Sequence, residues 1–179
     1  MQTGIHPSFL LTVLLGCCVW VQAMAHSGPS QHKAHRHGVA ELQVAVDGPT
    51  LVVRLESPLD NLLGFERAPR GDQERAAAER LLARLKSGER VVTPTAAAGC
   101  ALVSAEVTAP VLHGGGAGDG HADLTAEWRF QCREPAQLRG LRVELFAGHP
   151  RLKRLDATVA GPRGQKAQHL TARMPDLVW

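Results

Sequence analysis

Alternating apolar and polar positions mark where regular structure begins in this chain. From position 39 onward, every second residue is apolar and faces one side: Ala40, Leu42, Val44 and Val46. The turn pair Asp47-Gly48 follows, and the same period then returns in Leu51, Val53 and Leu55. A period of two places alternate side chains on one face of a strand, and Asp-Gly favours tight hairpin turns. The pattern therefore predicts a β-hairpin over residues 39–56.

A helical period follows after an irregular segment over residues 57–71, which is rich in Pro, Gly, Asp and Asn. The apolar positions that share one helix face are Ala78, Leu81, Leu82 and Leu85. Asp72 is a suitable N-cap, and Gly88 suits the position just beyond the C-terminus. We expect a helix over residues 73–87 whose apolar stripe faces the core.

Strand patterns fill much of the remaining chain, over residues 100–109, 123–132, 141–146, 153–160 and 166–171. The clearest is the segment 123–132, where one face carries Leu124, Ala126, Trp128, Phe130 and Cys132. Strands and helices do not alternate as they do in parallel α/β folds. We therefore expect an α+β fold in a single globular domain over residues 39–179. Its sheet would be mostly antiparallel, with the helix at 73–87 packed against it.

The first 25 residues have a different character, because they contain no Lys, Arg, Asp or Glu. Their apolar run from Phe9 to Val21 is shorter than the ~20 residues of a membrane span, and Ala23-Met24-Ala25 follows it. This pattern predicts a cleavable signal peptide over residues 1–25. A loose lipobox ending at Cys17 makes lipid anchoring an alternative. No later segment approaches spanning length.

Cleavage would leave two cysteines, Cys100 and Cys132, both at ends of predicted strands. In an exported domain, two such cysteines most simply form one disulfide. A thiolate metal site and a free pair of thiols are the alternatives. Because neither cysteine has a neighbour at CxxC spacing, thiolate zinc is disfavoured.

Charge and motifs narrow the function. The formal net charge of +3 is mild and evenly spread, and no Lys/Arg run is longer than two, so nucleic-acid binding is not indicated. The chain has no G-x-S-x-G, no H-E-x-x-H and no phosphate-binding glycine loop. We therefore expect a protein that is not an enzyme.

Histidines are the unusual feature of the composition. The polar arm over residues 26–38 carries His26, His32, His35 and His37. If this segment is extended, side chains two residues apart point the same way, about 6.5–7 Å apart, and Glu41 falls on the same face. A second group flanks the glycine-rich connection over residues 110–122: His113, Asp119, His121 and Asp123.

Imidazole and carboxylate ligands suit Zn²⁺, with Ni²⁺ and Cu²⁺ as competitors in vitro. The alternative is a solvated arm whose histidines are incidental. His149 and His169 stand alone in the sequence, and we expect them to be structural or exposed. Three carboxylates around the predicted loop, those of Glu56, Asp60 and Glu66, either contribute to metal binding or order the loop.

Two blocks, from His37 to Gly48 and from Leu55 to Glu66, resemble the ZrgA family of zinc-regulated periplasmic proteins. Later landmarks are similar as well: Ala98-Gly99-Cys100, His121-Ala122-Asp123, the strand from Trp128 to Cys132, and Gly164-Gln165. The resemblance implies a periplasmic zinc-binding accessory protein for zinc uptake or buffering, acting beside a zinc ABC transporter or its solute-binding protein.

The same resemblance places metal-binding tracts at the N-terminal histidines and in the middle connection, over residues 112–122. In that connection the chain departs from its relatives, because glycine replaces most of their histidines. We therefore expect one or two zinc ions per chain. An envelope protein-interaction module and a metal-dependent hydrolase are the alternative functions.

Overall fold

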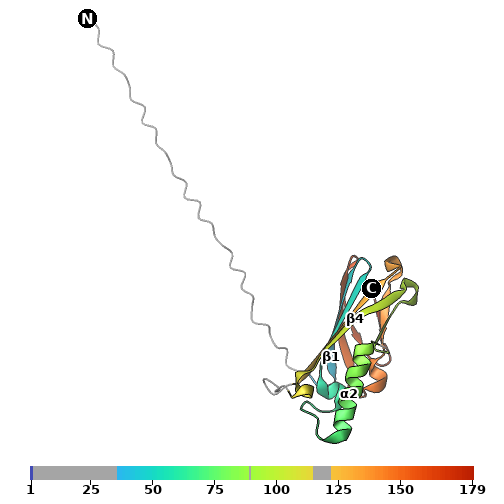
Figure 1. Cartoon of the computed structure of the whole chain (residues 1–179). Helices are drawn as coiled ribbons and strands as arrows, with labels where there is room; N and C mark the ends of the chain where they lie inside the picture. Colours follow the sequence, from blue (N-terminus) through green and yellow to red (C-terminus); the bar gives the residue numbers. More distant parts are fainter. Residues whose placement is uncertain (2–35, 89, 115–121) are drawn as a thin grey trace. The chain divides into compact units, whose positions relative to one another are not determined.

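The computed structural model describes Met1 and residues 36–88, 90–114 and 122–179, which belong, Met1 aside, to the compact unit Lys33–Trp179 (Figure 1). The strands of this part are β1 (Val39–Asp47), β2 (Thr50–Pro58), β3 (Val92–Pro94), β4 (Cys100–Thr108), β5 (Asp123–Cys132), β6 (Gly140–Val143), β7 (Arg154–Gly161), β8 (Gly164–Leu170) and β9 (Asp176–Val178). Its α-helices are α1 (Leu59–Leu63) and α2 (Gly71–Ser87), and its 3₁₀ helices are η1 (Ala96–Ala98), η2 (Pro110–His113), η3 (Pro135–Gln137) and η4 (Leu145–Gly148).

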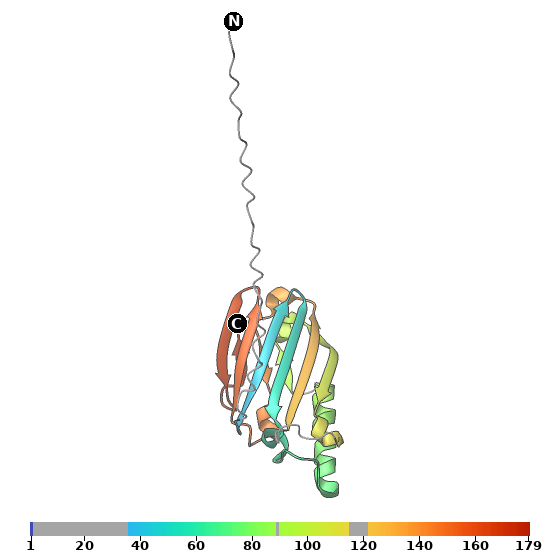
Figure 2. The same cartoon turned by 90° about the vertical axis from the view of Figure 1, so that its left-hand side faces the viewer.

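The strands form two sheets. The larger has six strands in the order β4-β5-β2-β1-β7-β8, and Figure 2 shows it face on. The smaller has three, in the order β3-β6-β9. Within these sheets only β1 and β7 pair in parallel; the other pairs of described strands are antiparallel. The expected α+β architecture, mostly antiparallel with one principal helix, is confirmed.

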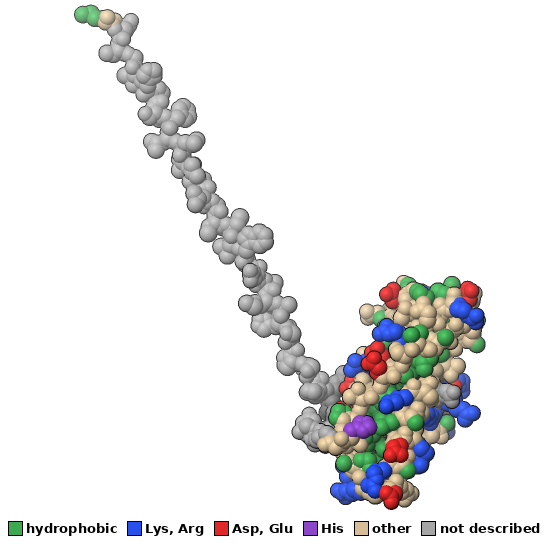
Figure 3. All heavy atoms as spheres, in the orientation of Figure 1, with side chains coloured by type: hydrophobic (Ala, Val, Ile, Leu, Met, Phe, Trp, Pro, Cys, Tyr) green, Lys and Arg blue, Asp and Glu red, His purple; other side chains and the backbone are tan. Residues whose placement is uncertain are grey.

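One face of the large sheet forms the core. The inward side chains of β1, β2 and β5 are the apolar set that the sequence predicts, with Leu42, Leu55 and Leu124 fully buried. Helix α2 and the small sheet contribute to the same cluster of buried residues. The surface is mixed in charge, and Figure 3 shows acidic and basic side chains interspersed over one side of the molecule. No helix in the described ranges is long and apolar enough to cross a membrane.

The principal helix begins earlier than the sequence predicts. Helix α2 starts at Gly71, its N-cap is Arg70, and Asp72 lies in the first turn instead of capping it. The carboxylate of Glu74 accepts the Arg70 backbone N–H at 2.5 Å and two hydrogen bonds from Arg67. Arg70 has no side-chain acceptor, so the helix starts without a side-chain N-cap, and Glu74 satisfies the N–H of Arg70 itself. The predicted apolar stripe is confirmed, with Ala78, Leu81 and Leu85 buried.

Several short elements differ from the sequence-based expectation. The strand expected over residues 141–146 ends at Val143, because Leu145–Gly148 turns into η4. The segment expected to be irregular, 57–71, contains α1. Strands β3 and β9, each of three residues, were not predicted, and they complete the small sheet on either side of β6.

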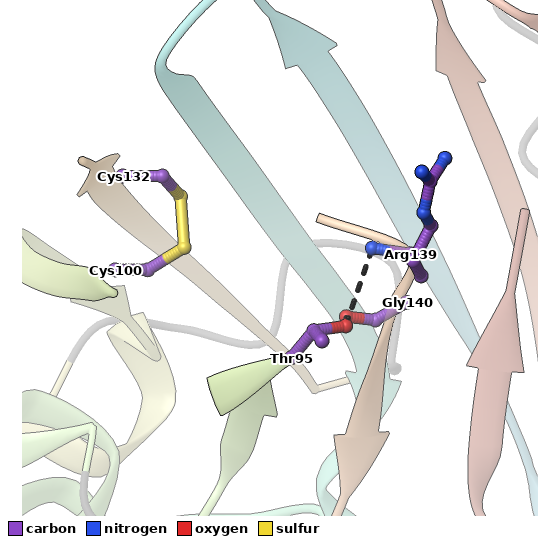
Figure 4. The surroundings of a disulfide bond; sticks show 5 residues. All are labelled: Thr95, Cys100, Cys132, Arg139 and Gly140. Carbon is purple, nitrogen blue, oxygen red and sulfur yellow. Dashed lines mark hydrogen bonds between the residues drawn. A yellow bond between two sulfur atoms is a disulfide. The ribbon is translucent and has the colours of Figure 1, made fainter. Parts of the chain in front are cut away.

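A disulfide joins Cys100 and Cys132, which lie opposite each other at the ends of β4 and β5 (Figure 4). The expected pairing is therefore present in the structure. The backbone N–H of Cys132 also donates to Pro49 O at 2.8 Å, in the turn between β1 and β2. The disulfide thus lies at the end of the large sheet where the β1–β2 hairpin turns.

Candidate metal-binding site

Helix α1 forms hydrogen bonds with the backbone at the two points where the histidine-containing segments join the domain. The side chain of Asn61, 1% exposed, accepts the Gly38 N–H at Oδ1 (2.6 Å) and donates from Nδ2 to Val39 O (2.9 Å). At the start of the same helix, the Leu59 N–H donates to Ala122 O at 2.9 Å. The end of the N-terminal arm and the end of the middle connection therefore meet the domain at one place.

The local sequence explains why a helix forms here. Pro58 ends β2 and immediately precedes α1, and it is extended at φ −50° and ψ 136°. Leu59 and Leu62 are buried in the core, which holds the short helix against the sheet. Gly64 ends it in the left-handed conformation, at φ 85°, and its N–H bonds to Asp60 O. Glycine adopts this conformation without the strain a side chain would bring.

His37 lies between two carboxylates at this end of the sheet. Its Nε2 is 3.3 Å from Glu66 Oε1, and its Nδ1 is 4.0 Å from Asp60 Oδ2. The His37 side chain is 63% exposed, whereas those of Asp60 and Glu66 are 12% and 18% exposed. An accessible imidazole thus stands above two largely buried carboxylates.

The two carboxylates differ in how far they are already engaged. Asp60 accepts two hydrogen bonds from the Arg151 guanidinium, at 2.9 Å and 3.1 Å. This pairing raises the pKa of Arg151. A metal ion at Asp60 would have to compete with this bidentate partner. Among the described residues, Glu66 is paired with no Lys or Arg, and its contact with His37 makes it the better ligand.

The spacing of His37 Nε2 and Glu66 Oε1 fits a shared zinc ion. Bonds of about 2.0–2.2 Å from Zn²⁺ to nitrogen and oxygen, at the tetrahedral angle, separate two ligand atoms by about 3.3–3.6 Å. The observed separation is 3.3 Å. Asp60 faces the other ring nitrogen, so one ion cannot take both carboxylates together with His37.

Two ligands do not complete a zinc site, and the described residues contain no group of three or more His, Cys, Asp or Glu able to hold a metal. A tetrahedral ion bound here would take its remaining ligands from other parts of the chain or from water. The predicted ligands His26, His32, His35, Asp119 and His121 lie outside the described residues.

Glu41 does not share a face with His37 in the way an extended arm would require. Residues 36–39 form a turn, closed by the Val39 N–H donating to Arg36 O at 3.0 Å. Gly38 in this turn has φ 83°, a left-handed conformation that interrupts the alternation of a strand. The turn directs His37 toward α1, while Glu41 remains on β1, in register with Glu56.

The remaining predicted ligands lie near the middle connection. His113 ends η2 and is exposed. Asp123 is the first residue of β5 and pairs in register with Pro58, directly before α1. The connection between them therefore leaves and re-enters the domain at the same end of the sheet as His37.

The two other described histidines have structural surroundings. His149 is buried, its Nδ1 lies 2.9 Å from Leu62 O, and desolvation lowers its pKa. His169 is exposed, and its Nδ1 lies 2.8 Å from Asp156 Oδ1. Arg154 also bonds Asp156; burial raises the pKa of this carboxyl group, but the hydrogen bonds and charges of Arg154 and His169 outweigh it and lower the pKa.

Sequence reasoning missed Asn61 and Arg151, and it left two roles open for Asp60 and Glu66: metal binding or ordering of the loop. The position of Asn61 within the similar block from Leu55 to Glu66 was the only available signal. Arg151 is distant in sequence, and its ion pair with Asp60 spans 91 positions. Nothing in the local pattern indicates that pairing.

Comparison with known proteins supports a role in metal handling. The family model described as "ZrgA family zinc uptake protein" matches residues 34–179. This match begins within the histidine-containing arm and extends to the last residue of the sequence. A search of curated proteins found no match to the chain.

Proposed function

Because the chain belongs to the ZrgA family of zinc uptake proteins, we propose that it is a periplasmic zinc-binding accessory protein without enzymatic activity. In this role it collects or buffers Zn²⁺ and makes the ion available for uptake. Its partner is a zinc ABC transporter or the solute-binding protein of that transporter. Export through the signal peptide over residues 1–25 brings it to this compartment.

The observation that carries this proposal is the meeting of both histidine-containing segments at α1. Asn61 holds the base of the arm, and Leu59 holds the end of the middle connection, next to the pair of His37 and Glu66. Zinc is the cargo in this arrangement. His37 and Glu66 supply two ligands on the domain, and the arm supplies further imidazoles from His26, His32 and His35.

Such a site suits transfer better than permanent storage. His37 is mostly exposed, so a bound ion remains accessible to a second protein. Ligands on an arm can be replaced one at a time, whereas a closed site of four rigid ligands holds zinc tightly as a structural element. His113 and Asp123, at the ends of the middle connection, lie at the same end of the large sheet, but the arm supplies the imidazoles on which binding depends.

The test is growth under zinc limitation in the bacterium that encodes the chain. A strain lacking the gene should grow more slowly in chelator-treated medium, and the wild-type gene should restore growth. A gene encoding His26→Ala, His32→Ala, His35→Ala and His37→Ala together should fail to restore it. Added Zn²⁺ should rescue every strain, whereas added Mn²⁺ should not.

Immunoblots of the periplasmic fraction provide the control for export and abundance of the fourfold variant. If this variant accumulates normally and restores growth as well as the wild type, the proposed zinc role is wrong. If the deletion strain grows normally at every zinc concentration tested, the protein does not contribute to uptake.

A further inference from the structure

The end of the large sheet remote from His37 contains a cavity that the zinc role does not use. Its volume is about 650 Å³, within the range of small-molecule sites. The tips of the β1–β2 and β7–β8 hairpins, η3 and the end of the chain line it on its protein side, and it opens to solvent. The nine-residue strand β1 runs from the His37 end to this cavity, where Val46 forms part of the wall.

The wall of the cavity is apolar. Leu138 and Val159 are buried at 2% and 3% exposure, and Trp179 contributes a partly buried indole. Glycines of the two hairpin tips, Gly48, Gly161 and Gly164, are part of the lining. At Gly161, an added Cβ would approach Val46 to 3.2 Å, so that even alanine would crowd this wall.

The charged side chains of the cavity have one sign. Arg139, Arg163 and Lys166 line it, and no acidic side chain of the described residues does. Two of the three cations donate hydrogen bonds to backbone carbonyls: Arg163 to Leu138 O at 3.0 Å and Lys166 to Val178 O at 2.6 Å. Each keeps further N–H groups for a ligand.

Arg139 has a guanidinium that is free to bind. Its backbone is fixed, since its N–H donates to Thr95 Oγ1 at 3.2 Å and its carbonyl accepts the Trp179 N–H at 3.1 Å. Its side chain extends away from Thr95 and from the disulfide (Figure 4). Within the described part of the chain, the guanidinium makes no hydrogen bond or ion pair. A charged donor fork on a fixed backbone is suited to a carboxylate.

We propose that this cavity binds a small amphipathic organic anion, with its acidic head at Arg139 and its apolar body against Leu138, Val159 and Trp179. The uniform positive charge selects the sign of the head group. The apolar wall selects a hydrocarbon or aromatic body. This site lies at the opposite end of β1 from the proposed zinc ligands and does not depend on them.

The test uses the full chain, expressed with its own signal and purified as the host processes it. The probe is 1-anilinonaphthalene-8-sulfonate, an aromatic anion that fluoresces in apolar sites. We expect saturable binding that dodecanoate displaces. Dodecyltrimethylammonium, with the same chain length and the opposite charge, should displace it poorly. The titrations are carried out with EDTA and again with Zn²⁺, and both should give the same affinity.

The decisive variant is Arg139→Glu, because it reverses the charge without breaking a side-chain interaction. It should weaken binding of the probe and of dodecanoate at least tenfold, since a charge-assisted bond is lost and a repulsion gained. The matched control is Arg80→Glu, which makes the same change at an exposed position on α2. Ala136→Trp, which fills the cavity without changing its charge, should also abolish binding.

The proposal fails if the wild type does not bind the probe, or if the cationic amphiphile competes as well as dodecanoate. It fails equally if Arg139→Glu binds as tightly as Arg80→Glu while circular dichroism shows that both are folded. Because the measurement is made without metal, its failure would leave the zinc role untouched.

Discussion

Asn61 is the residue on which the position of His37 depends. It is the only asparagine in the sequence, it is buried, and it bonds to backbone on both sides of the Gly38–Val39 peptide. Its Nδ2 also donates to Ser57 Oγ at 3.3 Å. A side chain with one acceptor and two donors is needed to satisfy these partners, and aspartate could not donate to Val39 O.

We expect Asn61→Ala to lower the free energy of unfolding by about 2–3 kcal/mol, because buried backbone groups lose their partners. Urea unfolding followed by circular dichroism measures this loss. Gln73→Ala, which removes an amide from an exposed position on α2, is the control and should change stability by less than about 0.5 kcal/mol. Equal midpoints for the two variants would show that Asn61 does not anchor the arm.

His149 gives the stability a dependence on pH. Burial lowers its pKa in the folded state, and Arg84 lowers it further. The unfolded chain therefore binds a proton more readily than the folded one. This contribution to stability is complete above the unfolded pKa of about 6.5 and is lost as the pH falls toward the folded value.

We expect the wild type to lose more unfolding free energy between pH 7.5 and pH 5.5 than His149→Gln, whose amide can still donate to Leu62 O. Urea unfolding at the two pH values provides the comparison, and carboxylates affect both proteins alike. If both proteins lost the same free energy over this range, His149 would not be the group responsible.

At the scale of elements, long periodic segments are predictable and short ones are not. The β1–β2 hairpin, β5 and the body of α2 follow from spacing alone, because each buries a regular apolar face. Helix α1 has five residues and β9 has three, too few to show a period. The parallel pairing of β1 with β7 joins segments more than a hundred positions apart, which no local pattern encodes.

The candidate site can likewise be predicted from the sequence only in part. The histidine tract and the carboxylates at positions 60 and 66 are visible in the sequence. The proximity of His37 to these carboxylates is not visible, because it depends on the turn at Gly38, on α1 and on the ion pair from Arg151. A strand extended through His37 would have directed the imidazole along the sheet toward Glu41. The left-handed glycine directs it to Glu66 instead.

A hydrogen bond joins helix α2 to the large sheet, in addition to the apolar packing of Leu81 and Leu85 in the shared core. Trp128 Nε1, fully buried on β5, donates to Leu85 O in the last turn of the helix at 2.7 Å. Trp128→Phe removes this donor and leaves a cavity, and we expect a loss of about 2–4 kcal/mol. The control is Trp179→Phe at a partly buried position, which should cost about 1 kcal/mol or less. Similar losses of unfolding free energy in the two variants would contradict this assignment.

At the scale of the whole domain, the large sheet separates two candidate sites. At one end, α1 connects the arm and the middle connection beside His37 and Glu66. At the other, the hairpin tips line an open, positively charged cavity. The nine-residue strand β1 spans the distance between them, and we expect substitutions at one site to leave binding at the other unchanged.

The central claim is that His37 and Glu66 bind zinc together with histidines of the arm. Calorimetric titration of Zn²⁺ at pH 7.5 into the processed chain tests it most directly, with the fourfold histidine variant, Glu66→Gln and the control Glu79→Gln beside it. We expect micromolar or tighter binding by the wild type and by Glu79→Gln, several-fold weaker binding by Glu66→Gln, and none by the histidine variant. No binding by the wild type, or equal binding by all four proteins, would contradict the account.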